Sequence, residues 1–520
     1  MLARYARIVR NLVFGLFLLL VSCRSSAPDL VLAGGRIFTA DEARPWAEAL
    51  AVRGERIVAV GSNAEVRALA GPSTRVIELN GRVVVPGIND AHLHEPWGES
   101  GNLDIGGDAT VEQVFEAVAA GARAHPEGTV LRGQIPPIRL DDPRLTRDAL
   151  DAITTRHPVM LGNLAGHSVL HNSAALQWRG VAEGARDSQA GWYARDANGR
   201  LNGWVYEHAL WSSDRRMSAA LPDEQFAAQM RAFTADAVRY GITSVQSMPG
   251  IERDRAMRLA STMEVPLRWR WMDLQVNGVA DSPRHPVKYI LDGTPMEHGA
   301  AMRADYADRP GHRGRLDYTD AELARIVNAA AKSGQPTLLH ISGDLGVEKV
   351  FALMRATDAD WPALRLRIEH GDFIGPFAGE AQALGIVLVQ NPSHFMVPEV
   401  MQRRFGQVTD YQVFRSFIER GIPVAIGSDG PVNPWLNVMF ATMHPRNPSE
   451  AVTREQAVIA YTRGSAFAEF QEKEKGTLAP GMLADLAVLS QDVFTVPPPE
   501  LPKTTSMLTM IGGRIVWEQK

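Results

Sequence analysis

The sequence predicts an α/β protein: a (β/α)8 barrel of the TIM type, joined to a small β module that both ends of the chain build. Strand-like apolar runs alternate with helical stretches through most of the 520 residues, a pattern typical of parallel strands with crossover helices. Short β-type runs separated by turn signals occupy the two ends. Several strand-like runs in the middle also stop beside a metal-capable side chain, as expected at the active-site face of such a barrel.

The β module begins at residue 29, and the barrel interrupts it. Residues 29–85 hold β-type runs whose turns are marked by Gly-Gly, Arg-Gly-Glu and Asn-Gly. Residues 86–473 contain the alternating pattern, with "DEQFAAQMRAFTADAVRY" as one clear helical stretch. Residues 474–520 again contain short β-type runs separated by a turn signal, as in "TSMLTMIGGRIVWEQ". We therefore expect one composite domain from 29–85 and 474–520, and a barrel domain from 86–473.

The barrel region contains more strand-like runs than a barrel needs. About ten such runs occur between residues 84 and 429, whereas a (β/α)8 barrel has eight strands. The segment 129–210, with "TVLRGQIP" and "PVMLGNLAGHS", is where we expect an insertion.

Composition limits the kind of partner. Hydrophobic content of 45% and charged content of 22% are those of a globular enzyme, and the formal net charge is −5. No run rich in Lys and Arg appears in the chain. The sequence therefore predicts a small-molecule substrate and no nucleic-acid partner.

Residues 1–22 predict an export signal. Three arginines are followed by an apolar run of about ten residues, which is too short to span a bilayer that needs roughly 20. The run ends in "LVSC", and Cys23 is the only cysteine. This resembles a bacterial lipobox, which implies lipidation at Cys23, a short tether at 23–28 and a membrane contact through the lipid alone. Arg24 favours outer-membrane or periplasmic anchoring over the inner membrane. The alternative is an ordinary signal peptide followed by an incidental thiol.

Two histidines follow the first strand-like run of the barrel region. His92 and His94 are two residues apart, so on a strand both imidazoles point to the same face and can reach one ion. Imidazole suits zinc and similar divalent metals. The position after "VVVPGIND", at the end of an apolar run, favours a metal site over two solvent-facing side chains.

Three more candidate ligands end later runs. His340 and His370 each close an apolar run and are followed closely by Gly, and Asp429 lies in "GSDGP" after "IPVAI". Parallel strands would bring all of these ends to one face. An Asp there can hold a metal and also take a proton from metal-bound water. The alternative for Asp429 is a turn or capping residue.

Lys288 in "PVKYILDG" is the sixth candidate and the unusual one. A protonated lysine beside a dication is repelled by it. Either the side chain points away to solvent, or carbon dioxide converts the amine to a carbamate that serves as an anionic ligand.

The motifs taken in order resemble the amidohydrolase superfamily, and within it the amidohydrolase-3 (YtcJ-like) branch. They are "PGINDAHLH", "VKYILDG", "LLHISGD", "RIEHG", "QNPSH" and "IGSDGPV", with "LAGHSVLHNSAAL" and "GRLNGWVYEHA" between the first two. The resemblance covers about residues 29–520. It implies a metal-dependent TIM-barrel hydrolase with a β-sandwich made from both chain ends. It also implies metal ligands at His92, His94, His340 and His370, a metal-bound catalytic Asp429 and a carboxylated Lys288.

These observations lead to a functional hypothesis with two alternatives. One or two divalent ions, zinc first, would activate water for attack on a non-peptide C–N bond of a small amide or cyclic amide, with Asp429 as general base and then acid. Substrate contacts are expected from His167, Gln390 and His394, and from His298 in "DGTPMEHGA", where the chain departs from the branch. The same site could instead cleave an ester, lactone or phosphoester. A third hypothesis is an anchored metal-binding protein without catalysis.

Overall fold

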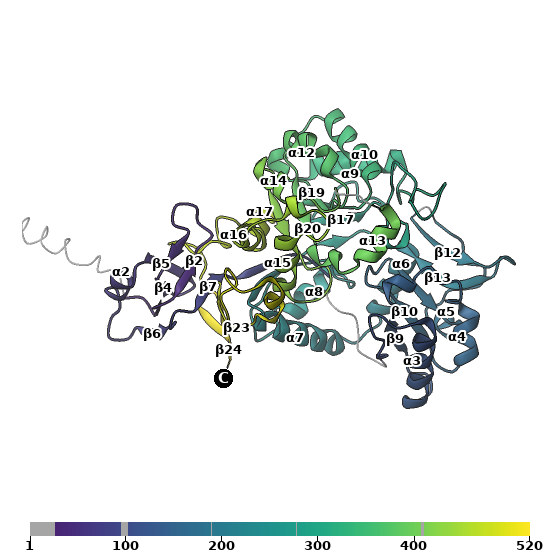
Figure 1. Ribbon diagram of the computed structural model, residues 1–520, viewed down its shortest axis with the longest axis horizontal. Helices are drawn as coiled ribbons and strands as arrows, with labels where there is room; N and C mark the ends of the chain where they lie inside the picture. The colour runs from purple at the N-terminus through teal and green to yellow at the C-terminus, as the bar shows by residue number, and fades with distance from the viewer. Residues whose placement is uncertain (1–26, 95–101, 189, 277, 407–409, 520) are drawn as a thin grey trace, which may run out of the picture.

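The computed structural model describes residues 27–94, 102–188, 190–276, 278–406 and 410–519 (Figure 1). The expected signal at residues 1–22, the lipidation site Cys23 and most of the tether lie outside these residues. In the part of the chain that is described, no helix has both the length and the apolar content to cross a membrane.

A barrel of eight parallel strands forms the centre of the described structure. Its strands are β8 (Ile88–Leu93), β14 (Ile242–Ser247), β15 (Arg268–Trp271) with its continuation β16 (Asp273–Leu274), β17 (Val287–Ile290), β18 (Thr337–Ile341), β19 (Arg367–His370), β20 (Val387–Gln390) and β21 (Val424–Ile426). The ladders within β8–β14–β15 and from β16 to β21 are all parallel. Most of these strands are buried along their whole length, as strands inside a barrel covered by helices are.

Helices follow the strands and cover the outside of the barrel. They are α7 (Asp223–Arg239), α8 (Arg253–Ala260), α9 (Asp320–Ser333), α10 (Asp344–Ala356), α11 (Trp361–Leu364), α12 (Ala378–Leu384), α13 (Pro398–Phe405), α14 (Arg415–Glu419), α15 (Pro434–Met443), α16 (Arg454–Ile459) and α17 (Ser465–Ala468). Helix α9 shows why such segments are helical. Thr319 and Glu322 form a capping box at its start, and Gly334 ends it in the left-handed conformation.

The barrel closes where β21 meets β8. The backbone N–H of Asp429 donates to His92 O at 2.9 Å, and that of Ser428 donates to Asp90 Oδ1 at 2.9 Å. A Cβ on Gly427 would lie 2.4 Å from both the backbone N and the Cβ of His92, so only glycine allows this approach. The closure brings the end of the last strand against the end of the first.

The excess of strand-like runs belongs to an insertion between β8 and β14. It forms a separate sheet in the order β12-β13-β11-β10-β9. Its elements are α3 (Val111–Ala124), β9 (Leu131–Gln134), α4 (Arg147–Ile153), β10 (Val159–Gly162), β11 (Ser168–His171), α5 (Ser173–Trp178), β12 (Gly191–Arg195), β13 (Leu201–Tyr206) and α6 (Glu207–Ala219). Figure 1 shows this lobe beside the barrel, on the side away from the β module.

Both ends of the chain build the β module, as two sheets. One has the order β5-β4-β1-β6 and the other the order β24-β23-β22-β7-β2-β3. The elements from the N-terminal part are β1 (Leu30–Ala33), β2 (Arg36–Phe38), β3 (Trp46–Ala47), β4 (Ala49–Arg53), β5 (Arg56–Gly61), α2 (Asn63–Arg67), β6 (Arg75–Glu78) and β7 (Val83–Pro86). Those from the C-terminal part are β22 (Leu486–Leu489), β23 (Ser506–Ile511) and β24 (Arg514–Glu518). Strand β7 joins the two ends by pairing with β2 on one side and with β22 on the other. The predicted fold class, a barrel with a small sandwich from both ends, is confirmed.

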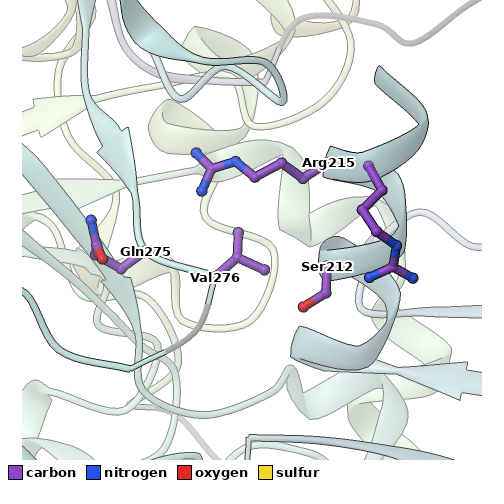
Figure 2. Close-up of a pocket in the computed structure, with 5 residues that line it drawn as sticks. Ser212, Arg215, Gln275 and Val276 are labelled. Atoms are coloured by element: carbon purple, nitrogen blue, oxygen red, sulfur yellow. The ribbon is translucent and has the colours of Figure 1, made fainter. Parts of the chain in front are cut away.

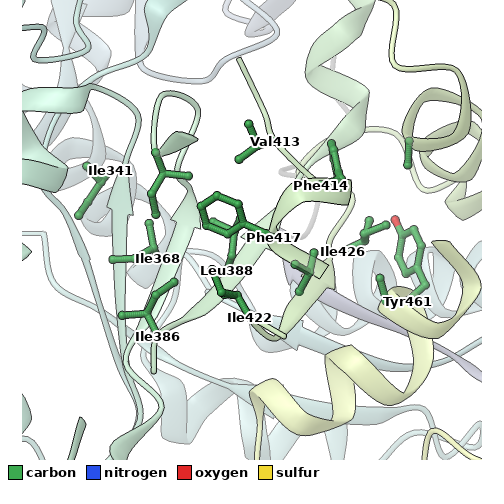
Figure 3. Packing of buried hydrophobic residues seen from close by; sticks show 14 of the residues in the cluster. Ile341, Ile368, Ile386, Leu388, Val413, Phe414, Phe417, Ile422, Ile426 and Tyr461 are labelled. Carbon is green, nitrogen blue, oxygen red and sulfur yellow. The ribbon is translucent and has the colours of Figure 1, made fainter. Parts of the chain in front are cut away.

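A continuous apolar core lies between the strands and the helices around them. Figure 3 shows part of it behind β18 to β21, where Ile368, Leu388 and Ile426 meet Phe417. All four side chains are fully buried. This packing fixes the strands, and therefore fixes the side chains that their ends present to the site.

Candidate metal centre and active site

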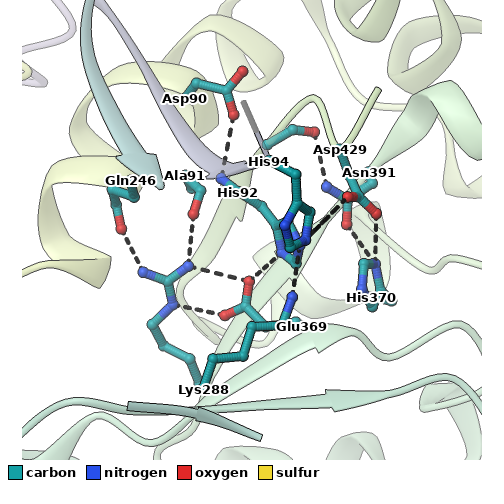
Figure 4. Close-up of polar contacts among 12 residues, drawn as sticks. Asp90, Ala91, His92, His94, Gln246, Lys288, Glu369, His370, Asn391 and Asp429 are labelled. Atoms are coloured by element: carbon teal, nitrogen blue, oxygen red, sulfur yellow. Dashed lines mark hydrogen bonds and ion pairs between the residues drawn. The ribbon is translucent and has the colours of Figure 1, made fainter. Parts of the chain in front are cut away.

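The six residues predicted as ligands meet at the carboxyl ends of the barrel strands. His92 lies on β8 and His94 just after it, Lys288 lies on β17, His340 on β18 and His370 at the end of β19. Asp429 follows β21 by three residues. Figure 4 shows five of these side chains, all but His340, pointing toward one another from β8 and its end, β17, β19 and the segment after β21.

Asp429 is at the centre of this cluster. Its Oδ1 lies 3.5 Å from His92 Nε2 and 3.8 Å from His94 Nε2, and its Oδ2 lies 3.7 Å from His370 Nδ1. The His340 ring completes the group, with its centroid 4.3 Å from that of His370. Like His370, Asp429 has a positive φ, which turns its side chain back toward the strand ends.

The donor set fits a divalent metal ion. Burial lowers the pKa of all four histidines below the ordinary value, to about 3 for His94, so the imidazoles are neutral as metal ligands must be. Nε2 of His340 is buried, and no described residue gives it a hydrogen-bond partner. Such an orphaned nitrogen, beside three more imidazoles and a carboxylate, is what a zinc-type site provides.

Lys288 is buried at the base of the cluster rather than exposed to solvent. Its side chain is 1% exposed, and Nζ lies 2.8 Å from His92 Nε2. Burial lowers the pKa of the Lys288 amine to about 8. A substantial minority of the amine is then unprotonated near neutral pH, and this is the form that can add carbon dioxide.

Two further residues, which the sequence did not single out, hold the ligands. Glu369 Oε2 contacts His92 Nδ1 at 2.6 Å, so the Nε2 atom of His92 faces the cluster. Glu369 is itself held by Arg367 at 2.8 Å, and both side chains are buried. Asn391 Oδ1 contacts His370 Nδ1 at 2.8 Å. The sequence signal that could have identified Glu369 is its pairing with Arg367 in "RIEH", because this strand-like run is otherwise expected to be buried.

A cavity opens above the cluster, and His167 and His394 line it together with His340, His370 and Asp429. His394 Nε2 lies 3.2 Å from Asp429 Oδ2. Burial lowers the pKa of His394, but Asp372 and Asp429 outweigh it and raise the pKa to about 9. The rest of the lining is mostly apolar and is formed by Leu164, Ala165, Pro295, Met296, Val397, Met401 and Tyr411, with Thr294, Ser342 and Asp372 as its polar members.

His298 and Gln390 do not line this cavity. His298 Nε2 contacts Asp308 at 3.0 Å, and Nδ1 lies 3.8 Å from Asp141. The buried guanidinium of Arg404 contacts both of these carboxylates, at 2.7 Å for Asp141, so a cation already occupies this second cluster. Gln390 is fully buried, and within the described chain neither polar atom of its side chain has a hydrogen-bond partner.

The structure has another pocket, beside α6. Figure 2 shows it between Ser212 and Arg215 on the helix and Gln275 and Val276 after β16; Arg216 completes the lining. Neither an imidazole nor a carboxylate lines it, so it offers no metal ligand and no general base.

Comparison with known proteins agrees with this fold and site. Residues 75–517 match the sequence model of an amidohydrolase family, Amidohydro_3. The chain belongs to this family of metal-dependent hydrolases. It is therefore an enzyme that hydrolyses carbon–nitrogen bonds other than peptide bonds.

Similar proteins span almost the whole chain. The putative amidohydrolase YtcJ of Bacillus subtilis is 28% identical, over 94% of this chain and 99% of its own length. An N-substituted formamide deformylase of Arthrobacter pascens is 27% identical, over 94% of this chain and 98% of its own length. Among solved structures, an uncharacterised metal-dependent hydrolase of Pyrococcus horikoshii OT3 superposes with a TM-score of 0.70 at 20% identity, covering 91% of this chain and 99% of its own. That likeness shows the shared fold.

Proposed function

We propose that this enzyme hydrolyses the C–N bond of a small amide or cyclic amide at the strand-end cluster, with Asp429 as the group that accepts and returns the proton. The observation that carries the proposal is the meeting of four imidazoles, Lys288 and Asp429 at one end of the barrel. A structural role for these side chains does not account for six polar groups, five of them buried or half-buried, that meet from five separate segments.

The residues that would hold one or two divalent ions, zinc first, are His92, His94, His340, His370 and Asp429, with Lys288 as a carbamate. A bound ion would supply a water of lowered pKa and would polarise the substrate carbonyl. Lys288 suits the carbamate role because its buried amine, with a pKa of about 8, adds carbon dioxide, releases a proton and becomes an anion. That anion would replace a repulsive charge beside the ligands with an attractive one.

Asp429 is placed for proton transfer. Burial raises the pKa of its carboxyl, but contacts with His92 and then His394 hold that pKa well below the ordinary value, so the group is ionised. One oxygen faces His92 and His94, and the other faces His394. His394, whose two ring nitrogens face Asp429 and Asp372, therefore orients the carboxylate, and His167 offers a nitrogen atom to the substrate at the cavity wall.

The cavity and the relatives favour an amide substrate with an apolar part. The apolar side chains in the cavity lining suit an alkyl or aromatic group. Among similar proteins, one is named an N-substituted formamide deformylase and several are named imidazolonepropionases. The ester, lactone and phosphoester alternative uses the same site.

Metal removal tests the proposal. The protein is treated with a chelator, and hydrolysis of matched amides and esters is followed after adding zinc, with and without bicarbonate. We expect chelation to abolish amide hydrolysis and zinc to restore it, most fully with bicarbonate because Lys288 then carries the carbamate. Activity that survives chelation and exhaustive dialysis would contradict a metal-dependent mechanism. A large preference for the ester of each matched pair would favour the alternative.

We further propose that the enzyme is exported and held at the cell envelope by a lipid on Cys23. The support is the order of basic residues, apolar run and sole cysteine at the N-terminus. In a bacterial host, wild-type protein is expected in the membrane fraction, and Cys23→Ser in the soluble fraction or retained uncleaved. Equal distribution and equal processing of the two proteins would refute the anchor.

A further inference from the structure

Glu207 is a buried acid in a strained conformation at the edge of the cavity. It is 1% exposed and begins α6 directly after β13. Its φ is +53°, in the left-handed region that residues other than glycine rarely adopt. A non-glycine residue stays in such a conformation only where its surroundings require it.

Glu207 makes two contacts with one residue, His167. Its backbone N–H donates to His167 O at 2.9 Å, and its side-chain Oε2 lies 2.8 Å from His167 Nδ1. The second carboxyl oxygen occupies room left by Gly293, where a Cβ would lie 2.5 Å from it. The strained backbone is therefore the geometry that brings this carboxyl group to that imidazole.

The imidazole of His167 is also held on its other sides. Trp211, one turn further along α6, meets it edge-on with ring centroids 5.0 Å apart. The ring of His340, a candidate metal ligand, lies 4.9 Å away. With Nδ1 taken by Glu207, the Nε2 atom points away from the acid, and His167 is one of the residues that line the cavity.

We infer that Glu207 is a positioning residue for the proposed amide hydrolysis: through His167 it fixes the nitrogen that contacts the substrate amide. This inference rests on the proposed function. Glu207 itself reaches no substrate. It sets the orientation and the tautomer of the imidazole, because one hydrogen bond at Nδ1 decides which nitrogen carries the proton.

The test is a cycle of variants at the two positions, with kcat and KM measured on an amide that the wild type hydrolyses. Glu207→Met keeps the length of the side chain and removes the hydrogen bond, and we expect kcat to fall about 10²-fold. Glu207→Gln is expected to stay within a few-fold of wild type, because an amide can donate to or accept from Nδ1. The double variant Glu207→Met/His167→Ala should be no slower than His167→Ala alone, because both changes remove the same interaction.

A matched control separates positioning from structure. Asp317 is a neighbouring carboxylate, 2% exposed, that lies 3.9 Å from His208 and does not line the cavity. Asp317→Leu removes a buried acid of the same kind and is expected to leave kcat unchanged. Zinc content and melting temperature of every variant are measured beside the rates, and zinc content should equal that of wild type throughout.

Three results would overturn the inference. The first is full activity of Glu207→Met, and the second is a loss in Glu207→Gln as large as in Glu207→Met. The third is a double variant whose fold-loss in kcat equals the product of the fold-losses of the two single variants. A merely structural role for Glu207 would produce that result. If wild type hydrolyses no amide in the panel, the proposed function fails before the variants are compared.

Discussion

Asp429→Asn is expected to lower kcat by about 10³-fold while the protein keeps its metal. Asparagine has the shape of aspartate and retains one oxygen for His92, His94 and a bound ion, but its amide accepts no proton at neutral pH. The backbone of Asp429, with its positive φ and its bond to His92 O, is unchanged by the substitution. KM should change little, because the cavity wall is intact.

The measurement pairs steady-state kinetics with metal analysis of the same sample. Zinc content near that of wild type, together with the lost turnover, assigns Asp429 to proton transfer. Near-normal kcat in the variant would remove Asp429 from that role. Loss of zinc would instead make it chiefly a ligand, and activity would then return at high zinc concentration.

Glu369→Gln is expected to destabilise the fold and weaken metal binding together. Burial raises the pKa of Glu369, but Arg367 and then His92 lower it more, to about 2, so the group is an ionised partner in the barrel interior. Removing its charge leaves the buried Arg367 uncompensated, which costs about 3–5 kcal/mol. It also replaces a charge-assisted hydrogen bond to His92 with a weaker one from a neutral amide, and weakening such an orienting partner lowers metal affinity, by up to about 10–100-fold where the partner is lost.

A double variant separates these two effects. Arg367→Met/Glu369→Leu replaces the buried ion pair with apolar side chains, so stability should recover toward wild type while zinc affinity stays low. Denaturant unfolding measures the first quantity, and zinc competition against a chelator measures the second. Wild-type zinc affinity in this double variant, which leaves no hydrogen-bonding side chain at position 369, would show that Glu369 does not hold His92 for a metal.

The position of the candidate ligands could be predicted because it depends on strand ends alone. His340 and His370 each close an apolar run, and parallel strands bring such ends together whatever the loops do. The insertion was harder to place. β9 and β10 are short apolar runs like the barrel strands, and only tertiary pairing shows that they form a sheet of their own. Periodicity does not separate two sheets built from similar runs.

The partners of the ligands could not be predicted, because each comes from a distant segment. Glu207 meets His167 only through the pairing of β13 with β11, and Glu369 meets His92 across the barrel. His298 was expected at the substrate, but its left-handed φ and its contacts with Asp308 and Asp141 hold it in the cluster around Arg404. Its neighbour Met296 lines the cavity instead.

The most direct test is a crystal structure of the zinc-loaded enzyme with anomalous diffraction recorded on both sides of the zinc absorption edge. The account predicts one or two peaks about 2.0–2.2 Å from nitrogen or oxygen atoms of His92, His94, His340, His370 and Asp429, with Lys288 extended by a carbamate. A peak only at the Asp141–His298–Asp308 cluster, or fully loaded crystals without a peak at the strand ends, would contradict it.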